Sequence, residues 1–69
     1  MFKVRFMQLL QNTTAYKLSK ATGIREGNIS RWKNLDELPS AENLVKVADY
    51  FDVSIDYLMG RTDNPEVNR

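Results

Sequence analysis

The chain has 69 residues, enough for one small domain, and it contains neither cysteine nor histidine. Disulfides, thiolate metal sites, cysteine nucleophiles and the commonest general base are therefore excluded. Neither a signal peptide nor a run approaching the roughly 20 apolar residues of a membrane span is found. These absences favour a cytoplasmic protein. They leave only a Ser/Lys or paired-carboxylate enzyme open, and we expect no enzyme, metal or cofactor.

The formal net charge of +1 conceals a strong asymmetry along the chain. Residues 1–35 hold seven basic side chains and one acid, whereas residues 36–69 hold three basic side chains and eight acids. Such polarity in a small domain indicates that one half faces a polyanion. The alternative is a solvated surface on which the charges segregated by chance.

The first half of the chain is predicted to form three short helices. A helix is predicted over 2–11, because its apolar residues fall on one face at helical spacing: Phe2, Phe6, Leu9 and Leu10. Thr14 is expected to cap a second helix over 15–21, and a third follows over 25–33.

The second half predicts two more helices. Ser40 caps an amphipathic helix whose apolar positions are Ala41, Leu44, Val45, Ala48 and Phe51. Ser54 caps a last short helix in the stretch "IDYLMG", with Gly60 at its end. The residues expected to close the core are Val53, Ile55 and Leu58. Residues 61–69 are polar and aperiodic, which predicts a flexible tail.

The stretch "LSKATGIREGNISRW", residues 18–32, places Gly23 inside an otherwise regular apolar pattern. A glycine there is a penalty in one continuous helix, but it makes a turn with positive φ between two helices. A helix-turn-helix also needs a small residue for the close crossing, here Ser19. Its apolar positions are filled by Leu18, Ile24, Ile29 and Trp32. The pattern therefore predicts a helix-turn-helix.

Three phrases stand out along about residues 13–65: "TAYKLSKATGI", "ISRWKN" and "LPSAENLVKVADYFDVSIDYLMGRTDNP". In these the chain resembles the phage-repressor and Cro-like (Xre-type) helix-turn-helix transcriptional regulators. The resemblance implies an all-α, compact five-helix lambda-repressor-like domain, which we place at residues 1–60. It further implies dimers on double-stranded operator DNA, with the helix after the glycine in the major groove.

On such a helix, the N-terminal end and the next turn face the DNA bases. The expected base-reading residues are Arg25, Glu26, Asn28 and Arg31. An arginine bonds guanine O6 and N7, and an asparagine bonds adenine N6 and N7. Glu26 has two interpretations. In the functional one its carboxylate accepts a hydrogen bond from cytosine N4 or repels non-cognate DNA. In the structural one its negative charge stabilises the N-terminal turn of the helix.

Phosphate contacts are expected where the second helix begins, because free amides point outward there. The expected phosphate-contacting residues are Thr14, Ala15, Tyr16, Lys17, Lys33 and Asn34. Members of the family often carry glutamine at the position of Ala15, so one contact of the family is missing here. For the lysines the alternative is ordinary solubility.

The segment after the third helix departs from the family. Leu35 replaces a glycine that normally ends the helix, so we expect Asn34 to adopt the left-handed conformation instead. Asp36 and Glu37 occupy a loop that is often basic in relatives and lies along the DNA backbone. Two acids there are expected to weaken phosphate contact.

Two functions remain open at this stage. The first is a DNA-binding repressor, a homodimer on a palindromic operator, whose expected interface residues are Tyr57 and Met59. The second is a protein-interaction module, such as an antitoxin or antirepressor target, whose acidic half meets a basic partner. Affinity that falls steeply with salt distinguishes the first from the second.

Overall fold

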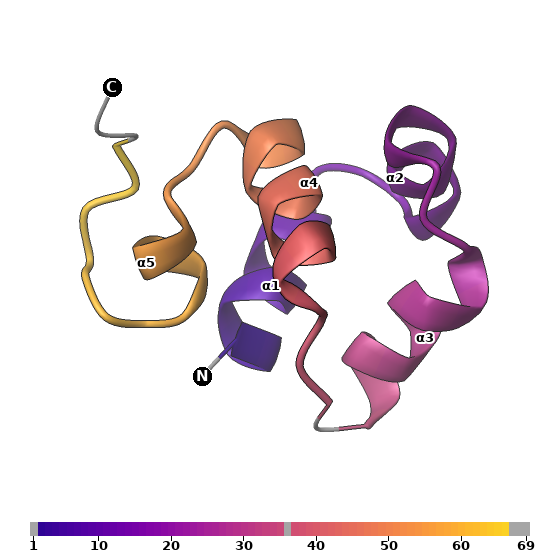
Figure 1. The fold of residues 1–69 in the computed structure, drawn as a ribbon, viewed down its shortest axis with the longest axis horizontal. Helices are drawn as coiled ribbons and strands as arrows, with labels where there is room; N and C mark the ends of the chain where they lie inside the picture. The colour runs from indigo at the N-terminus through magenta and orange to yellow at the C-terminus, as the bar shows by residue number, and fades with distance from the viewer. Residues whose placement is uncertain (1, 36, 67–69) are drawn as a thin grey trace.

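The computed structural model describes residues 2–35 and 37–66, and this part of the chain holds five α-helices and no strand. The helices in chain order are α1 (Phe2–Leu10), α2 (Ala15–Thr22), α3 (Glu26–Asn34), α4 (Ala41–Phe51) and α5 (Ile55–Leu58) (Figure 1). Each lies within about two residues of its predicted range. The predicted all-α, five-helix class is confirmed.

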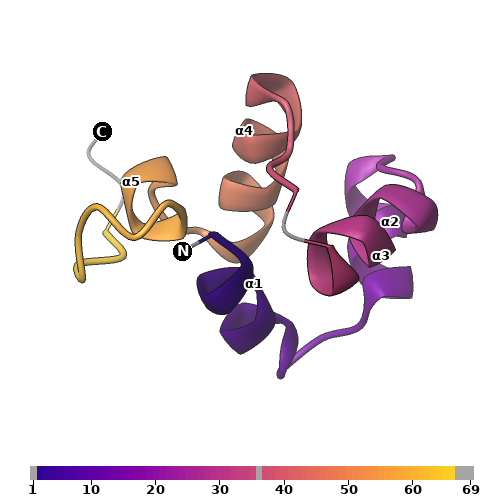
Figure 2. The same ribbon diagram turned by 90° about the horizontal axis from the view of Figure 1, so that it is seen from below.

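The helices are arranged around a middle formed by α1 and α4. The pair α2 and α3 lies at one end of the longest axis, and α5 with the segment that follows it lies at the other (Figures 1 and 2). Helix α3 contacts α1 and α2, whereas α5 contacts α1 and α4. This arrangement separates the helix-turn-helix from the C-terminal segment in space.

Serine and threonine caps start three of the helices, as the sequence predicts. Each cap residue is extended, and its hydroxyl oxygen accepts a hydrogen bond from the amide three residues later. The pairs are Thr14 with Lys17 at 3.1 Å, Ser40 with Asn43 at 3.3 Å, and Ser54 with Tyr57 at 3.0 Å.

Gly23 ends α2 in the left-handed conformation, with φ 78° and ψ 4°. Its amide donates to the carbonyl of Ser19 at 2.8 Å, and the Ser19 hydroxyl in turn donates to the carbonyl of Ile24. The small side chain of Ser19 thus ties α2 to the turn. The predicted role of Gly23 as the turn residue is confirmed.

Replacing Gly23 with alanine is expected to lower the free energy of unfolding by about 1–2 kcal/mol, the cost of an L-residue in the left-handed region. No atom lies within 4 Å of the added Cβ, so backbone strain alone is expected. Gly27→Ala is the matched control, because Gly27 lies inside α3 and its Cβ also meets open space. It should stabilise the domain by up to about 1 kcal/mol. Urea unfolding measures the free energy of unfolding of both variants. A change of the same sign in both contradicts the explanation by backbone strain at Gly23.

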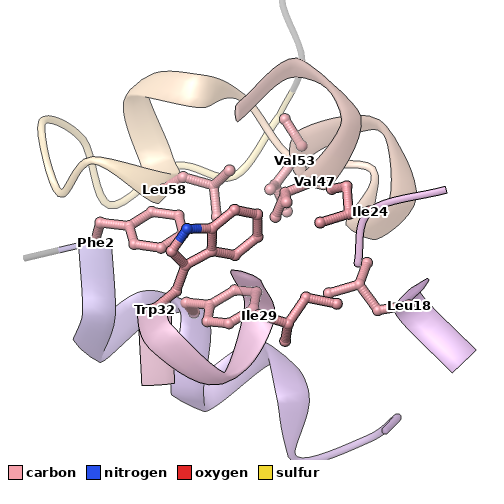
Figure 3. Packing of buried hydrophobic residues seen from close by; sticks show 10 residues of the cluster. Phe2, Leu18, Ile24, Ile29, Trp32, Val47, Val53 and Leu58 are labelled. Atoms are coloured by element: carbon pink, nitrogen blue, oxygen red, sulfur yellow. The ribbon is translucent and has the colours of Figure 1, made fainter. Parts of the chain in front are cut away.

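The core gathers ten buried side chains from every helix and from the turns (Figure 3). They are Phe2, Phe6, Leu18, Ile24, Ile29, Trp32, Val47, Ala48, Val53 and Leu58. Phe2, Phe6 and Trp32 form an aromatic group in it, and the partly buried Phe51 packs against this group. The ring of Phe6 lies 5.2 Å from Phe2, 5.8 Å from Trp32 and 6.4 Å from Phe51, measured between ring centroids.

Three residues predicted for the apolar face of α4 or for the core are instead exposed: Ala41, Val45 and Ile55. The buried stripe of α4 runs through Val47 and Ala48, with other apolar residues partly buried beside it. Val45 lies off this stripe, whereas Ala41 lies about two turns before Ala48 and is exposed at the first position of the helix. Ile55 opens the single turn of α5, which directs Leu58 rather than Ile55 into the core.

The end of α3 differs from the prediction. Leu35 follows the helix in an extended conformation, with φ −114° and ψ 154°, and its amide donates to the carbonyl of Arg31 at 2.8 Å. The predicted left-handed Asn34 is wrong, since among the described non-glycine residues only Asp52 has a positive φ. The chain leaves α3 directly into an extended loop, so no reversal is needed. Gly60 does take a positive φ, one residue after the cap of α5.

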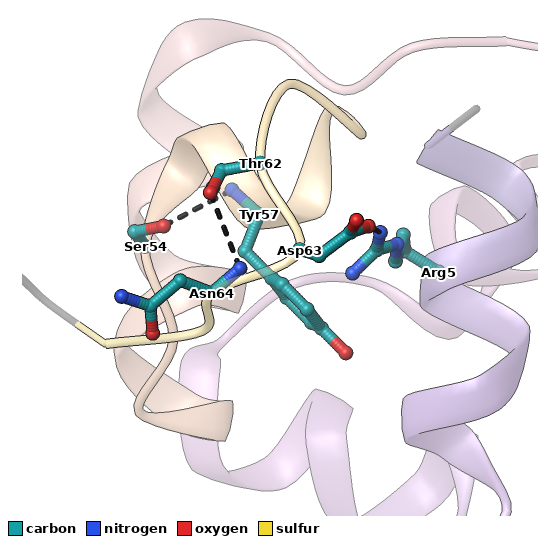
Figure 4. Close-up of polar contacts among 6 residues, drawn as sticks. All are labelled: Arg5, Ser54, Tyr57, Thr62, Asp63 and Asn64. Atoms are coloured by element: carbon teal, nitrogen blue, oxygen red, sulfur yellow. Dashed lines mark hydrogen bonds and ion pairs between the residues drawn. The ribbon is translucent and has the colours of Figure 1, made fainter.

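The segment after α5 lies against α1 and α5 (Figure 4). Asp63 pairs with Arg5 at 2.7 Å, and the Arg5 guanidinium lies 4.1 Å from the ring centroid of Tyr57. The carbonyl of Pro65 accepts a hydrogen bond from the amide of Ser54 at 3.0 Å. Flexibility of the tail 61–69 stays a prediction, and its last three residues lie outside the described part.

Candidate nucleic-acid interface

Helix α3 has one buried and one exposed side. Ile29 and Trp32 are buried and fix the helix against the core. The predicted base-reading residues lie on the exposed side: Arg25, Glu26, Asn28 and Arg31. Arg25 is the extended cap residue before the helix, and Glu26 is its first helical residue. The packing that buries one side therefore presents a continuous polar side to solvent.

Positive charge concentrates at the end of the molecule that α2 and α3 form (Figure 1). Between Ala15 and Asn34 there are five basic side chains and a single acid, Glu26. The acids Glu42, Asp49 and Asp56 belong instead to α4 and α5. The asymmetry seen along the sequence is thus also an asymmetry in space, suited to an anionic partner.

A hollow beside the start of α2 brings three predicted phosphate-contacting residues together. It is lined by Thr14, Ala15 and Lys33, with apolar residues of α1 behind them. The N-terminus of an eight-residue helix carries partial positive charge there, and Lys33 adds a full one from α3. A hydrogen bond of 2.8 Å between the hydroxyls of Thr13 and Tyr50 ties this corner to α4. The arrangement favours an oxyanion such as a phosphate.

The remaining predicted phosphate residues are exposed on α2 and at the end of α3. Tyr16 and Lys17 lie in the first turn of α2, and the ammonium of Lys20 lies 5.4 Å from the centroid of the Tyr16 ring. The side-chain amide of Asn34 donates to the Ser30 hydroxyl at 3.1 Å. These residues thus lie on two helices, Tyr16 and Lys17 on α2 and Asn34 on α3.

An ion pair between α3 and the loop that follows it was not predicted from the sequence. Arg31 donates from Nε and Nη2 to the two carboxylate oxygens of Glu37, both at 2.9 Å. Hydrogen bonds from Arg31 to the charged form hold the pKa of the Glu37 carboxyl below its usual value. A spacing of six residues is no helical pairing distance, and only the extended exit from α3 brings the two together. Asp36, the other acid expected in this loop, lies outside the described residues.

The residues predicted for a dimer interface are half-buried. Tyr57 and Met59 pack against the core from α5 and its end, and Arg5 covers one face of the Tyr57 ring. Arg5, whose side chain is only 14% exposed, was counted from the sequence merely as a positive charge. Nothing in its spacing to Asp63, 58 residues away, signals their contact.

None of the described helices is long and apolar enough to cross a membrane. Five helices, with α2 and α3 meeting at a left-handed glycine and α3 presenting a polar side, define a small lambda-repressor-like helix-turn-helix domain. The helix-turn-helix family model matches residues 5–58. The chain belongs to this family of transcriptional regulators, and the resemblance seen in its sequence is confirmed.

Two curated relatives are similar to the chain. An uncharacterized HTH-type transcriptional regulator of Bacillus subtilis (strain 168), YobD, is 28% identical over 64 residues, which is 93% of this chain and 57% of that protein. The cryptic phage CTXphi transcriptional repressor RstR of Vibrio cholerae is 38% identical over 50 residues, 72% of this chain and 45% of that protein. The chain spans about half the length of these relatives. No solved structure matches it significantly.

Proposed function

We propose that this chain is a sequence-specific regulator that binds double-stranded DNA and represses transcription, with α3 in the major groove. The observation that carries the proposal is the exposed side of α3, where Arg25, Asn28 and Arg31 lie opposite the buried Ile29 and Trp32. Arginine and asparagine offer the donors and acceptors that major-groove base edges require. The repressor role follows the similarity to a phage transcriptional repressor.

Phosphate contacts position α3 in the groove. In this proposal the start of α2 holds one phosphate, with the hydroxyl and amides of Thr14, Ala15 and Tyr16, while Lys17 lies beside it. Lys33 and Asn34, in the last turn of α3, bind the backbone as well, Lys33 from the hollow that it shares with Thr14 and Ala15. The proposed function uses no catalytic group, metal or cofactor, and we propose the cytoplasm as its location.

A homodimer is part of the proposal, since one small domain with about five phosphate contacts binds weakly at physiological salt. Tyr57 on α5 and Met59 at its C-terminal end are the proposed interface, at the end of the molecule away from α3 (Figure 1). A two-fold dimer binds a palindromic operator whose half-sites lie roughly 34 Å apart.

A selection from random double-stranded DNA, at about 50 and 150 mM salt, tests this function. Enrichment of a palindrome supports both the sequence-specific regulator and its dimer. Enrichment of a single half-site supports DNA reading and contradicts the dimer. Enrichment of no sequence at either salt contradicts the proposed function.

A protein-interaction module is the second candidate, and one feature of the far end favours it. A shallow groove between α4 and α5 is lined by exposed Val45 and Ile55 with Asp49 and Asp56 beside them. Apolar side chains edged by acids suit a basic, apolar partner. An Arg31→Ala substitution should leave binding of such a partner unchanged.

Lys33 provides a sharper test of the phosphate contacts. With about five contacts, affinity for DNA should fall roughly a hundredfold between about 50 and 150 mM salt. Lys33→Ala should weaken binding to all sequences alike and reduce the slope of log affinity against log salt by about 1. Lys46→Ala is the control, because Lys46 lies on α4 and pairs with Glu42 at 3.7 Å. Equal slopes for both variants contradict the contact at Lys33.

A further inference from the structure

Glu37 holds Arg31 by two parallel hydrogen bonds before any DNA is bound. The bonds run from Nε to Oε2 and from Nη2 to Oε1, each 2.9 Å long. Both side chains are accessible, at 60% for Arg31 and 43% for Glu37. An ion pair this exposed contributes little to the stability of a fold. Its effect is therefore on the orientation of Arg31, whose long side chain otherwise samples many rotamers.

The donors that Glu37 uses leave the other edge of the guanidinium available. Arginine has five N–H donors in one plane. Nε and Nη2 form the edge nearest the chain, and both oxygens of Glu37 bond to it. The outer edge, with one N–H from each Nη nitrogen, still presents two parallel donors. Two parallel donors are what guanine O6 and N7 accept in the major groove.

The pair with Glu37 favours base recognition by Arg31 over phosphate binding, because it changes the net charge at this position. Glu37 neutralises Arg31 locally, so the pair attracts a phosphate less than a free arginine does. The two outer donors of Arg31, in contrast, remain available, and the pair with Glu37 restricts their orientation. The paired Arg31 is thus better suited to discriminate a base than to add non-specific affinity.

We propose that Glu37 is a positioning residue for base readout: it fixes Arg31 by its inner edge so that the outer edge bonds a guanine. This inference rests on the proposed DNA-binding function of α3. The opposing account is that Glu37 sequesters Arg31 and repels DNA, so that its removal strengthens binding to every sequence.

Glu37→Gln separates the two accounts, since it removes the charge and one acceptor at nearly constant shape. Affinities are measured for the selected DNA site, for that site with the guanine contacted by Arg31 replaced, and for random-sequence DNA. The contacted guanine is the position at which Arg31→Ala abolishes preference. We expect Glu37→Gln to reduce discrimination at this position about tenfold, while binding to random DNA stays equal or becomes tighter.

Two controls make the result specific to the pair. In an Arg31→Ala background, Glu37→Gln should no longer change discrimination at that position. Glu42→Gln removes another exposed acid, on α4, and should leave discrimination unchanged. Circular dichroism verifies that each variant is folded.

The outcomes distinguish this inference from the function on which it rests. A wild-type protein without sequence preference contradicts the proposed function itself. A wild-type preference that Glu37→Gln leaves intact contradicts only the positioning role, as does tighter binding of all sequences with unchanged discrimination. A nitrogen-15 NMR signal of the Arg31 Nε–H, protected from exchange without DNA and lost in Glu37→Gln, supports the pair independently. Equal exchange in both proteins overturns it.

Discussion

Replacing Phe6 with alanine is expected to lower the free energy of unfolding by about 3–5 kcal/mol. Phe6 is fully buried, and its ring contacts Phe2, Trp32 and Phe51, which join α1 to α3 and α4. Truncation opens a cavity where three elements meet. A domain of this size rarely has more than about 3–5 kcal/mol of stability, so the variant should be largely unfolded at 25 °C.

Val4→Ala is the matched control for this prediction. Val4 lies on the same helix as Phe6, but it is 55% exposed. Its substitution should change the free energy of unfolding by no more than about 0.5 kcal/mol. Urea unfolding followed by tryptophan fluorescence measures both, because Trp32 lies 5.8 Å from Phe6. A cooperative transition of Phe6→Ala near that of the wild type contradicts the central role of the aromatic cluster.

Replacing Arg31 with alanine is expected to reduce discrimination between the selected DNA site and its single-base variants by about 5- to 150-fold at one position. The reason is the loss of a bidentate contact to a guanine. Binding to random DNA should weaken by a smaller, uniform factor, because there no base contact is lost and the change only removes one positive charge and leaves the Glu37 carboxylate unpaired. Competition binding with a series of single-base variants at fixed salt measures both effects.

Arg61→Ala is the control, since it removes the same charge at the far end of the molecule. Arg61 follows α5 and lies 3.9 Å from Asp56, and its side chain is exposed. Discrimination should be unchanged in this variant. If Arg31→Ala instead weakens binding to all sequences equally and the sequence preference is kept, Arg31 contacts a phosphate. That result contradicts base reading by Arg31.

Local chemistry made much of the fold predictable from the sequence. Thr14, Ser40 and Ser54 cap helices because the hydroxyl bonds an amide three residues away, a contact that needs no tertiary structure. Gly23 ends α2 for an equally local reason, the freedom of glycine to take a positive φ. The spacing of the apolar residues next to Gly23 predicted that Ile29 and Trp32 are buried. It therefore also predicted which side of α3 is exposed.

Tertiary structure decided the features that depend on contacts between residues more than about one helical turn apart in the sequence. Val45 and Ile55 are exposed because packing between the helices, which periodicity does not encode, decides which side of α4 and of α5 is buried. Pairing of Arg31 with Glu37 depends on the extended exit at Leu35.

The contact of Arg5 with Asp63 likewise requires α1 and the segment after α5 to lie side by side (Figure 4). The sequence by itself thus determined the helices and the helix-turn-helix, because caps and turns act over three or four residues. Only the folded chain decided which charges meet, since these contacts join segments whose distance in sequence carries no geometric information.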